Sequence, residues 1–304
     1  MLKKIFLRWL PYRFLHWVSR KDFPYTHEIV PAPPVFEQSF IEVPDEIAER
    51  SFYLCLRSDS FMEYYINING LYGDWEKESL KIWAFLSKKA QTIIDIGANT
   101  GIYTMVSKNN HPDAFVLAVE PIPINFQVLE ENILQNKLTK VVAQNVALSN
   151  YDGTSTMYML KDQLNFMTSL EGDRYATHPE IKGDKEVVEV AVEVCKYHTL
   201  HAQHHVGKID LLKIDVEGHE LAILEDMRDF LERDMPVILL EVIGDQAAES
   251  LDRLFKEIGY TTFISIDEIN LSKRVEKIWD NDHHNFLICL EETYQYLQSK
   301  ALVK

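Results

Sequence analysis

Short apolar runs alternate with segments of helical periodicity from residue 91 onward, and this alternation constrains the fold more than any other feature. Continuous apolar strands joined through helices are typical of parallel sheets that helices cover on both faces. The runs are TIIDIG (92–97), AFVLAVEP (114–121), VVAQNVAL (141–148), IDLLKID (209–215), PVILLEVI (236–243), TTFISI (261–266) and NFLICL (285–290). The sequence therefore predicts an α/β fold with a doubly wound, mostly parallel, seven-stranded sheet.

Helices are expected between most of these runs. One begins near Tyr103, and others cover 124–137, 219–232 and 247–259. Their apolar residues recur at the three- and four-residue spacing that places them on one helix face. The alternation is interrupted by a polar-rich stretch over 161–196, which ends in the strand-like run VVEVAVEV.

The chain is expected to have three parts: a basic, aromatic segment over 1–23, a connector with a small cap over 24–73, and the main domain over 74–304. The connector is proline-rich and has no helical period, so it is expected to be extended. The fold is thus an α/β domain with an N-terminal extension.

Local patterns predict the elements around the boundary at residue 74. SFYLCLRS (51–58) and FMEYYINI (61–68) are expected as strands of the cap. The main domain should open with a helix over 74–89, with Asp74 as its N-cap.

The charge balance argues against nucleic-acid substrates. The chain has a formal net charge of −16, although residues 1–21 contain six basic residues and no acidic ones. A chain with such an excess of acidic residues after residue 21 is not expected to bind a nucleic-acid backbone by counterion release. Cys55, Cys195 and Cys289 have no CxxC spacing, which favours a reducing, cytoplasmic location without disulfides or zinc.

The N-terminal segment has two interpretations. Arg8, Pro11 and Arg13 interrupt it, so it lacks the continuous apolar core of a signal peptide or membrane span. Its aromatic residues among cations would suit an anionic membrane surface, giving peripheral membrane contact through residues 1–22. The alternative is an ordinary helix packed on the domain.

Polar residues end five consecutive strands. In an open α/β sheet, ligands bind outside the C-terminal ends of the strands, near the point where strand order reverses. The residues at those ends are Asp95, Glu120, Asn145, Asp215 and Glu241. The turn DIGANTG has no GxGxxG and carries an acid, which disfavours a dinucleotide pyrophosphate. A cationic amine joined to a ribose, as in S-adenosylmethionine, suits these acids better.

The motifs in this region resemble a known family. DIGANTGIYT (95–104), AVEPIPINFQVLEENI (118–133), NVAL (145–148) and LLKIDVEGHELAIL (211–224) occur in the order and spacing of the FkbM-type family of S-adenosylmethionine-dependent methyltransferases. The resemblance covers residues 72–290. It implies a Rossmann-like class I methyltransferase sheet whose last strand, NFLICL, runs antiparallel.

The resemblance also implies which residues bind the cofactor. Glu120 would hold the ribose, while Asn145 and Ala147 would lie against the adenine. The methionine end would be lined by Asp95, Gly97, Asn99 and Gly101.

Methyl transfer to a hydroxyl requires alignment for an in-line displacement and a group that removes the proton. Asp215 is expected to face the reacting methyl group. His219, at a helix N-terminus that favours the neutral imidazole, is the first candidate base. His283 and His284 precede the antiparallel strand at the same edge of the sheet and are the second choice. Glu220 is interpreted as an electrostatic helix cap.

A metal site is not favoured. Asp215 and Glu241 end neighbouring strands and could share a divalent cation, but the sequence identifies no third ligand. The HAQHH cluster (His201, His204, His205) has metal-ligand spacing, yet it is placed in a polar connector and its side chains are expected to be solvated.

The expected function is O-methylation of a hydroxyl on a sugar, glycan or secondary metabolite, with nitrogen acceptors left open. Acceptor contacts are expected from segments 72–78, 161–186 and 267–284. An NAD-dependent nucleotide-sugar enzyme is the enzymatic alternative, but it predicts the missing GxGxxG. A non-catalytic methyltransferase-like scaffold should have lost Asp95, Gly97 or Glu120, and all three are present.

Overall fold

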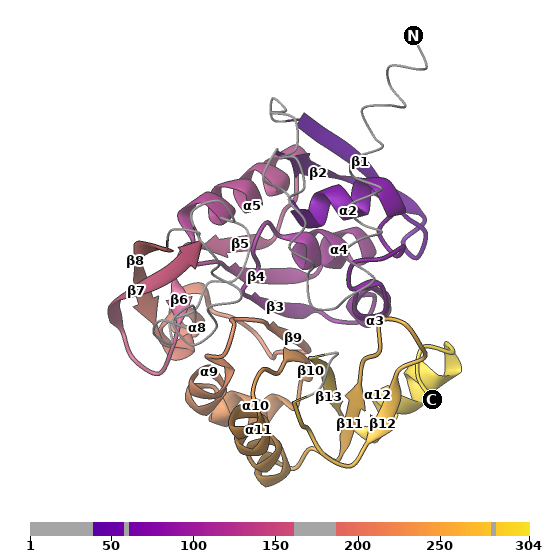
Figure 1. The fold of residues 1–304 in the computed structure, drawn as a ribbon, viewed down its shortest axis with the longest axis vertical. Coiled ribbons are helices and arrows are strands. Elements are labelled where there is room, and N and C mark those ends of the chain that lie inside the picture. Colours follow the sequence, from indigo (N-terminus) through magenta and orange to yellow (C-terminus); the bar gives the residue numbers. More distant parts are fainter. Residues whose placement is uncertain (1–38, 58–60, 161–186, 281–283) are drawn as a thin grey trace.

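The computed structural model describes residues 39–57, 61–160, 187–280 and 284–304 (Figure 1). The basic segment, most of the connector, the insertion 161–186 and His283 lie outside this part of the chain. Within it, no helix is long and apolar enough to cross a membrane.

An eight-stranded sheet forms the centre, in the order β12-β11-β13-β10-β9-β3-β4-β5 (Figure 1). Its strands are β3 (Thr92–Ile96), β4 (Phe115–Val119), β5 (Val141–Gln144), β9 (Leu211–Ile214), β10 (Val237–Glu241), β11 (Thr262–Ser265), β12 (Lys273–Val275) and β13 (Asn285–Cys289). The five strands from β5 to β10 run parallel, and β13 is antiparallel to β10 and β11. Each of the seven expected runs thus contributes one strand to this sheet, and β12 adds an eighth by pairing with β11.

Helices cover both faces because each strand alternates its apolar side chains between them. Ile93 packs in one core cluster and Ile94 in the other. The first cluster includes residues of α3 (Lys77–Ser87), α4 (Ile102–Asn110) and α12 (Glu291–Ser299). The second includes residues of α8 (Tyr197–His204), α9 (Glu220–Asp226), α10 (Arg228–Asp234) and α11 (Asp245–Ile258). The sheet is doubly wound, as predicted.

A small cap packs against the first face. It consists of the hairpin β1 (Ser39–Asp45) and β2 (Arg50–Leu56) and the helix α2 (Phe61–Asn69). The amide N–H of Cys55 donates to Asn132 Oδ1 on α5 (Pro123–Gln135), at 2.7 Å. Val43, Phe52 and Leu54 join the same core cluster as the sheet. Tertiary packing thus joins the cap to the main domain.

A second, three-stranded sheet follows β5. It has the order β6-β8-β7, formed by β6 (Ala147–Leu148), β7 (Gly153–Leu160) and β8 (Val187–Cys195). The expectation of one strand over 141–148 is wrong, because the chain leaves the main sheet at Asn145. That side-chain amide donates to the carbonyls of Glu120 and Pro121.

Two expectations around the cap boundary are wrong. Residues 61–68 are in helix α2 rather than a strand, since short apolar and aromatic runs fit either period and packing on β2 decides between them. Helix α3 begins at Lys77 with Glu76 in the N-cap position, so Asp74 is not its cap.

Two expectations further along the chain also need correction. The helix expected over 219–232 is two helices, interrupted at the fully buried Met227. The HAQHH cluster lies in and directly after α8 instead of in a connector, and the His201 ring packs on Phe230, with centroids 4.5 Å apart. His201 and His204 are half-buried, and only His205 is exposed.

We expect Gly97→Ala to destabilise the protein by about 3 kcal/mol or more. Gly97 has φ +73°, and a Cβ there would lie 1.8 Å from the Asp215 carbonyl oxygen at the end of β9. Urea unfolding of the variant and the parent measures the loss. Gly259→Ala is the matched control, because Gly259 also has positive φ (+112°) but open space around the added carbon. Equal losses for the two variants would contradict the close approach at Gly97.

Candidate functional site

The acids that end the central strands meet at one edge of the sheet. The chain passes from β3 outward through β4 and β5 and then returns to β9 on the other side of β3, so strand order reverses between β3 and β9. Asp95, Glu120, Asp215 and Glu241 lie in or directly after strands with the same direction. This is where open α/β sheets bind ligands.

Asp95 and Lys213 form a buried pair of opposite charges across the reversal point. They are register partners on β3 and β9, so both side chains lie on one face of the sheet. Asp95 is fully buried and its Oδ2 accepts a hydrogen bond from Thr104 Oγ1 at 2.7 Å. Burial raises the Asp95 pKa, while Lys213 and Thr104 counteract that rise. Lys213 thus stabilises the ionised form of the Asp95 carboxylate, which burial disfavours.

Lys213 also links Asp95 to the rim of the site. Its Nζ lies 2.9 Å from Asp215 Oδ2 and 4.9 Å from the centre of the Tyr103 ring. Burial lowers the Lys213 pKa, but Asp215, Asp95 and Glu76 raise it more, so the net shift is upward. The ammonium group therefore stays charged at neutral pH.

The glycine turn after β3 holds Glu120 at the end of β4. The Glu120 carboxylate accepts hydrogen bonds from the backbone N–H groups of Asn99 (2.8 Å) and Ile122 (2.9 Å). Asn99 has φ +51° and Gly101, at the N-cap of α4, has φ +91°. Burial raises the Glu120 pKa to about 7, although these backbone hydrogen bonds lower it. Glu120 is thus fixed in orientation by the turn expected to bind the cofactor.

The predicted adenine contacts lie beside this turn. Asn145 holds the loop after β4 through its two carbonyl contacts, and Ala147 is buried in β6 against Ile122. Their side chains are thus engaged within the protein, and contact with a cofactor stays a prediction.

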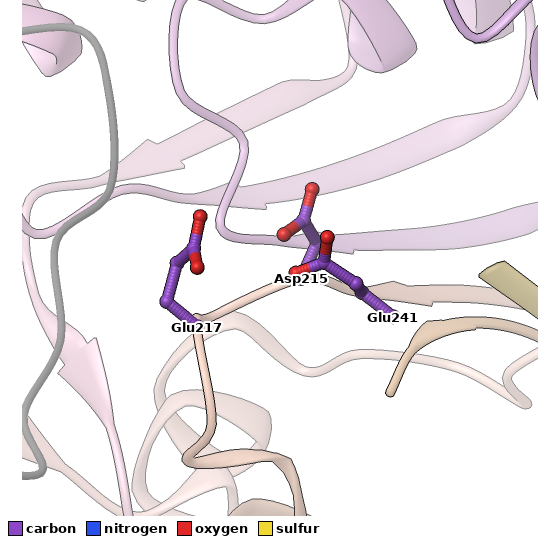
Figure 2. A group of neighbouring side chains, drawn as sticks. All are labelled: Asp215, Glu217 and Glu241. Atoms are coloured by element: carbon purple, nitrogen blue, oxygen red, sulfur yellow. The ribbon is translucent and has the colours of Figure 1, made fainter. Parts of the chain in front are cut away.

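Three carboxylates gather at the ends of β9 and β10 (Figure 2). Asp215, Glu217 and Glu241 each offer an oxygen within 4.8 Å of the others, and Figure 2 shows Asp215 and Glu241 side by side with Glu217 across from them. Burial raises the Glu241 pKa well above its usual value, and Asp215, Glu217 and Glu220 raise it further. The sequence alone does not group Glu217 with Asp215 and Glu241, because only the turn after β9 brings its side chain toward Glu241.

The candidate bases His219 and His284 come from two different elements near this cluster. His219 precedes α9, and its Nε2 lies 2.9 Å from the Ser149 hydroxyl. The backbone carbonyl of His284 accepts from Val242 N–H at 2.8 Å, and its ring nitrogen Nδ1 lies 3.5 Å from Asp280. His284 is therefore beside the end of β10, as its position before β13 suggested. Glu220 accepts from Gly218 N–H at 3.0 Å, in the turn before α9, and its role as an electrostatic helix cap stays a prediction.

A family model described as the methyltransferase FkbM domain matches residues 95–262, more than half of the chain. The match begins at Asp95 and includes the ends of β3, β4, β9 and β10. The chain belongs to the FkbM methyltransferase domain family.

Curated relatives of this FkbM-domain protein include "Methyltransferase 1" of Beauveria bassiana, which is 30% identical over 45% of this chain and 58% of its own length. The chain thus spans less than two thirds of that relative. The 31-O-demethyl-FK506 methyltransferase FkbM of Streptomyces tacrolimicus is 23% identical over 63% of this chain and 80% of its own length. The hexuronic acid methyltransferase AglP of Haloferax volcanii is 25% identical over 72% and 83%.

Among solved structures, the methyltransferase FkbM of Methylobacillus flagellatus KT matches with a TM-score of 0.40. It is 14% identical to this chain, over 66% of this chain and 43% of its own.

Helix α3 brings further residues to the site of the FkbM domain. Glu268 accepts hydrogen bonds from the backbone N–H groups of Glu78 (2.7 Å) and Ser79 (3.1 Å), which fixes the N-terminus of α3 over the sheet edge. Glu76 then accepts from the Tyr103 hydroxyl at 2.5 Å. Burial raises the Glu76 pKa, as does the neighbouring Asp215. The sequence points to segment 72–78 but does not single out this carboxylate.

Lys213 and Glu268 belong to the site but are not predicted from the sequence, and only Lys213 has a local sequence signal. Lys213 is the only cation within the apolar run that forms β9, so its burial is visible in the sequence. Glu268 lies in a loop far from α3 along the chain, and no local pattern connects them.

We expect the parent to lose stability relative to Glu120→Gln as pH rises from 4.5 to 7. Glu120 has a folded-state pKa of about 7 against an ordinary value of 4.5, so over this interval the folded state binds more protons than the unfolded state. The full difference is roughly 3 kcal/mol. Unfolding free energies across this range measure it, with Glu130→Gln, an exposed glutamate on α5, as the control. A pH-independent difference between parent and Glu120→Gln would contradict the raised pKa.

Proposed function

We propose that this protein is an S-adenosylmethionine-dependent methyltransferase that methylates a hydroxyl oxygen on a sugar, glycan or secondary metabolite. One observation carries the proposal. The glycine turn after β3 and the fixed carboxylate of Glu120 after β4 lie together at the strand-order reversal of an FkbM-family domain.

Glu120 is suited to bind a ribose diol. Each of its oxygens accepts one backbone N–H, and a carboxylate oxygen has a second lone pair for a hydroxyl donor. Ribose hydroxyls donate more strongly to a charged carboxylate, so cofactor binding would favour ionised Glu120. Gly97, Asn99 and Gly101 would allow backbone approach to the methionine end. Asp95 would support this turn from the core side, since its carboxylate is fully buried and accepts a hydrogen bond from Thr104.

The cofactor, when bound, supplies a methyl group made electrophilic by its sulfonium. The protein's own contribution is to align the acceptor and to accept its proton. Asp215 would orient the acceptor hydroxyl, because it is half-buried at the end of β9 and held by Lys213. His219 remains the first proposed base. His284 is the alternative, together with His283, which lies outside the described residues.

The names of the relatives favour this acceptor class. One is named as a methyltransferase of 31-O-demethyl-FK506 and another as a hexuronic acid methyltransferase. The acid-lined rim formed by Glu76, Asp215, Glu217 and Glu241 suits hydroxyl donors. We place the reaction in the reducing cytoplasm, which fits the free Cys55, Cys195 and Cys289.

The test is calorimetric titration with S-adenosylhomocysteine. We expect micromolar binding to the parent and at least tenfold weaker binding to Glu120→Gln, which corresponds to about 1.4 kcal/mol. Glu130→Gln removes the same charge from an exposed position on α5 and should bind like the parent. A folded parent that does not bind would overturn the enzyme assignment and favour the non-catalytic scaffold. An unchanged affinity in Glu120→Gln would overturn the ribose contact.

A further inference from the structure

We propose that Asp215, Glu217 and Glu241 form a binding site for a divalent cation with oxygen ligands, such as Mg²⁺ or Mn²⁺ (Figure 2). We also propose that the ion holds the methyl acceptor, and this role rests on the proposed function. The binding of the ion to the protein does not depend on that function.

The spacing of the three carboxylates fits such an ion. One oxygen from each lies within 4.8 Å of the other two. Two ligands on opposite sides of Mg²⁺ are about 4.2 Å apart, and those of Ca²⁺ are up to about 5 Å apart. The three side chains come from the end of β9, the turn after it and the end of β10, so small side-chain rotations would close the set around an ion.

A second observation points to a ligand. The Glu241 Oε2 atom is buried and has no hydrogen-bond partner within the described residues. A buried carboxylate oxygen without a donor is costly, because it has lost its water and gained nothing in exchange. Figure 2 shows the Glu241 carboxylate directed toward Asp215 on the neighbouring strand. A cation between them would supply the missing partner.

Three like charges lie close together in this cluster. Asp215 and Glu241 are close enough to share a hydrogen bond, and Glu217 adds a third carboxylate. The neighbouring cation, Lys213, lies on Oδ2 of Asp215 and also serves the buried Asp95. Ionised carboxylates this close together repel one another, and a divalent ion offsets that repulsion.

The chemistry of the ligands defines the class of ion. Carboxylate oxygens without sulfur or imidazole favour hard cations that prefer oxygen, namely Mg²⁺, Mn²⁺ and Ca²⁺. Three protein ligands leave coordination positions open. Two adjacent oxygens of the acceptor would fill these positions, which would fix the acceptor and stabilise its hydroxyl in the deprotonated form. An acceptor that itself carries a carboxylate would also be tolerated beside these acids.

The test measures Mn²⁺ binding to the full chain by the loss of the free-ion electron paramagnetic resonance signal, without cofactor. We expect one ion per chain, and at least tenfold weaker binding in Glu217→Gln and in Glu241→Gln. Glu232→Gln, which removes the same charge from an exposed position on α10, is the control and should bind like the parent.

Thermal unfolding shows whether each variant is folded. Without metal, Glu241→Gln should be at least as stable as the parent, because one repelling charge is gone, and only the parent and Glu232→Gln should gain stability from Mn²⁺. A folded parent that leaves the ion free up to roughly 1 mM would overturn the site. Equal binding by all three variants would do the same and identify a general surface effect. S-Adenosylhomocysteine binding with no Mn²⁺ binding would overturn the metal site and leave the methyltransferase proposal intact.

Discussion

The site depends on the electrostatic interaction of the buried Lys213 ammonium with the carboxylates of Asp95 and Asp215. Lys213 lies in the middle of β9 with Asp95 beside it on β3 and Asp215 after it at the strand end. Without this ammonium, the fully buried Asp95 would lose the cation that compensates its charge, and the half-buried Asp215 would lose its ion-pair partner. Breaking a buried ion pair by removing one partner typically costs about 3–5 kcal/mol. The lysine therefore ties the two strands at the reversal point to the acids of the rim.

The same cation organises the layer above the sheet. Its ammonium lies over the Tyr103 ring, and the Tyr103 hydroxyl donates to Glu76 before α3. Glu268 fixes the N-terminus of α3 by accepting the N–H groups of Glu78 and Ser79. Because its carboxylate accepts backbone N–H groups there, it also interacts favourably with the helix dipole. The sheet edge and helix α3 are thus linked by one cation–π contact and by hydrogen bonds to carboxylates.

Acidic residues at the rim have two consequences. Burial and mutual repulsion raise the pKa values of Glu76 and Glu241, so these carboxyl groups favour bound protons. A ligand that brings positive charge would replace those protons. In the proposed reaction, the sulfonium cofactor and a divalent ion both bring such charge, and the acids would then serve as ligands and hydrogen-bond acceptors instead of as a source of repulsion.

Local sequence patterns are enough to define the central sheet and the acids at its edge. Apolar runs of strand length and glycine turns are local signals, so they place Asp95, Glu120, Asp215 and Glu241 at strand ends without any tertiary information. Such patterns fail where two periods compete, as in α2, or where a tertiary contact interrupts a run, as Asn145 does after β5.

Which side chains face one another depends on the tertiary structure alone. Glu217 joins Asp215 and Glu241 through the turn after β9, and Glu268 reaches α3 across 190 positions of sequence. Such contacts depend on strand register and helix docking. Local sequence does not determine register or docking, because both are selected by burial against surfaces that distant parts of the chain form.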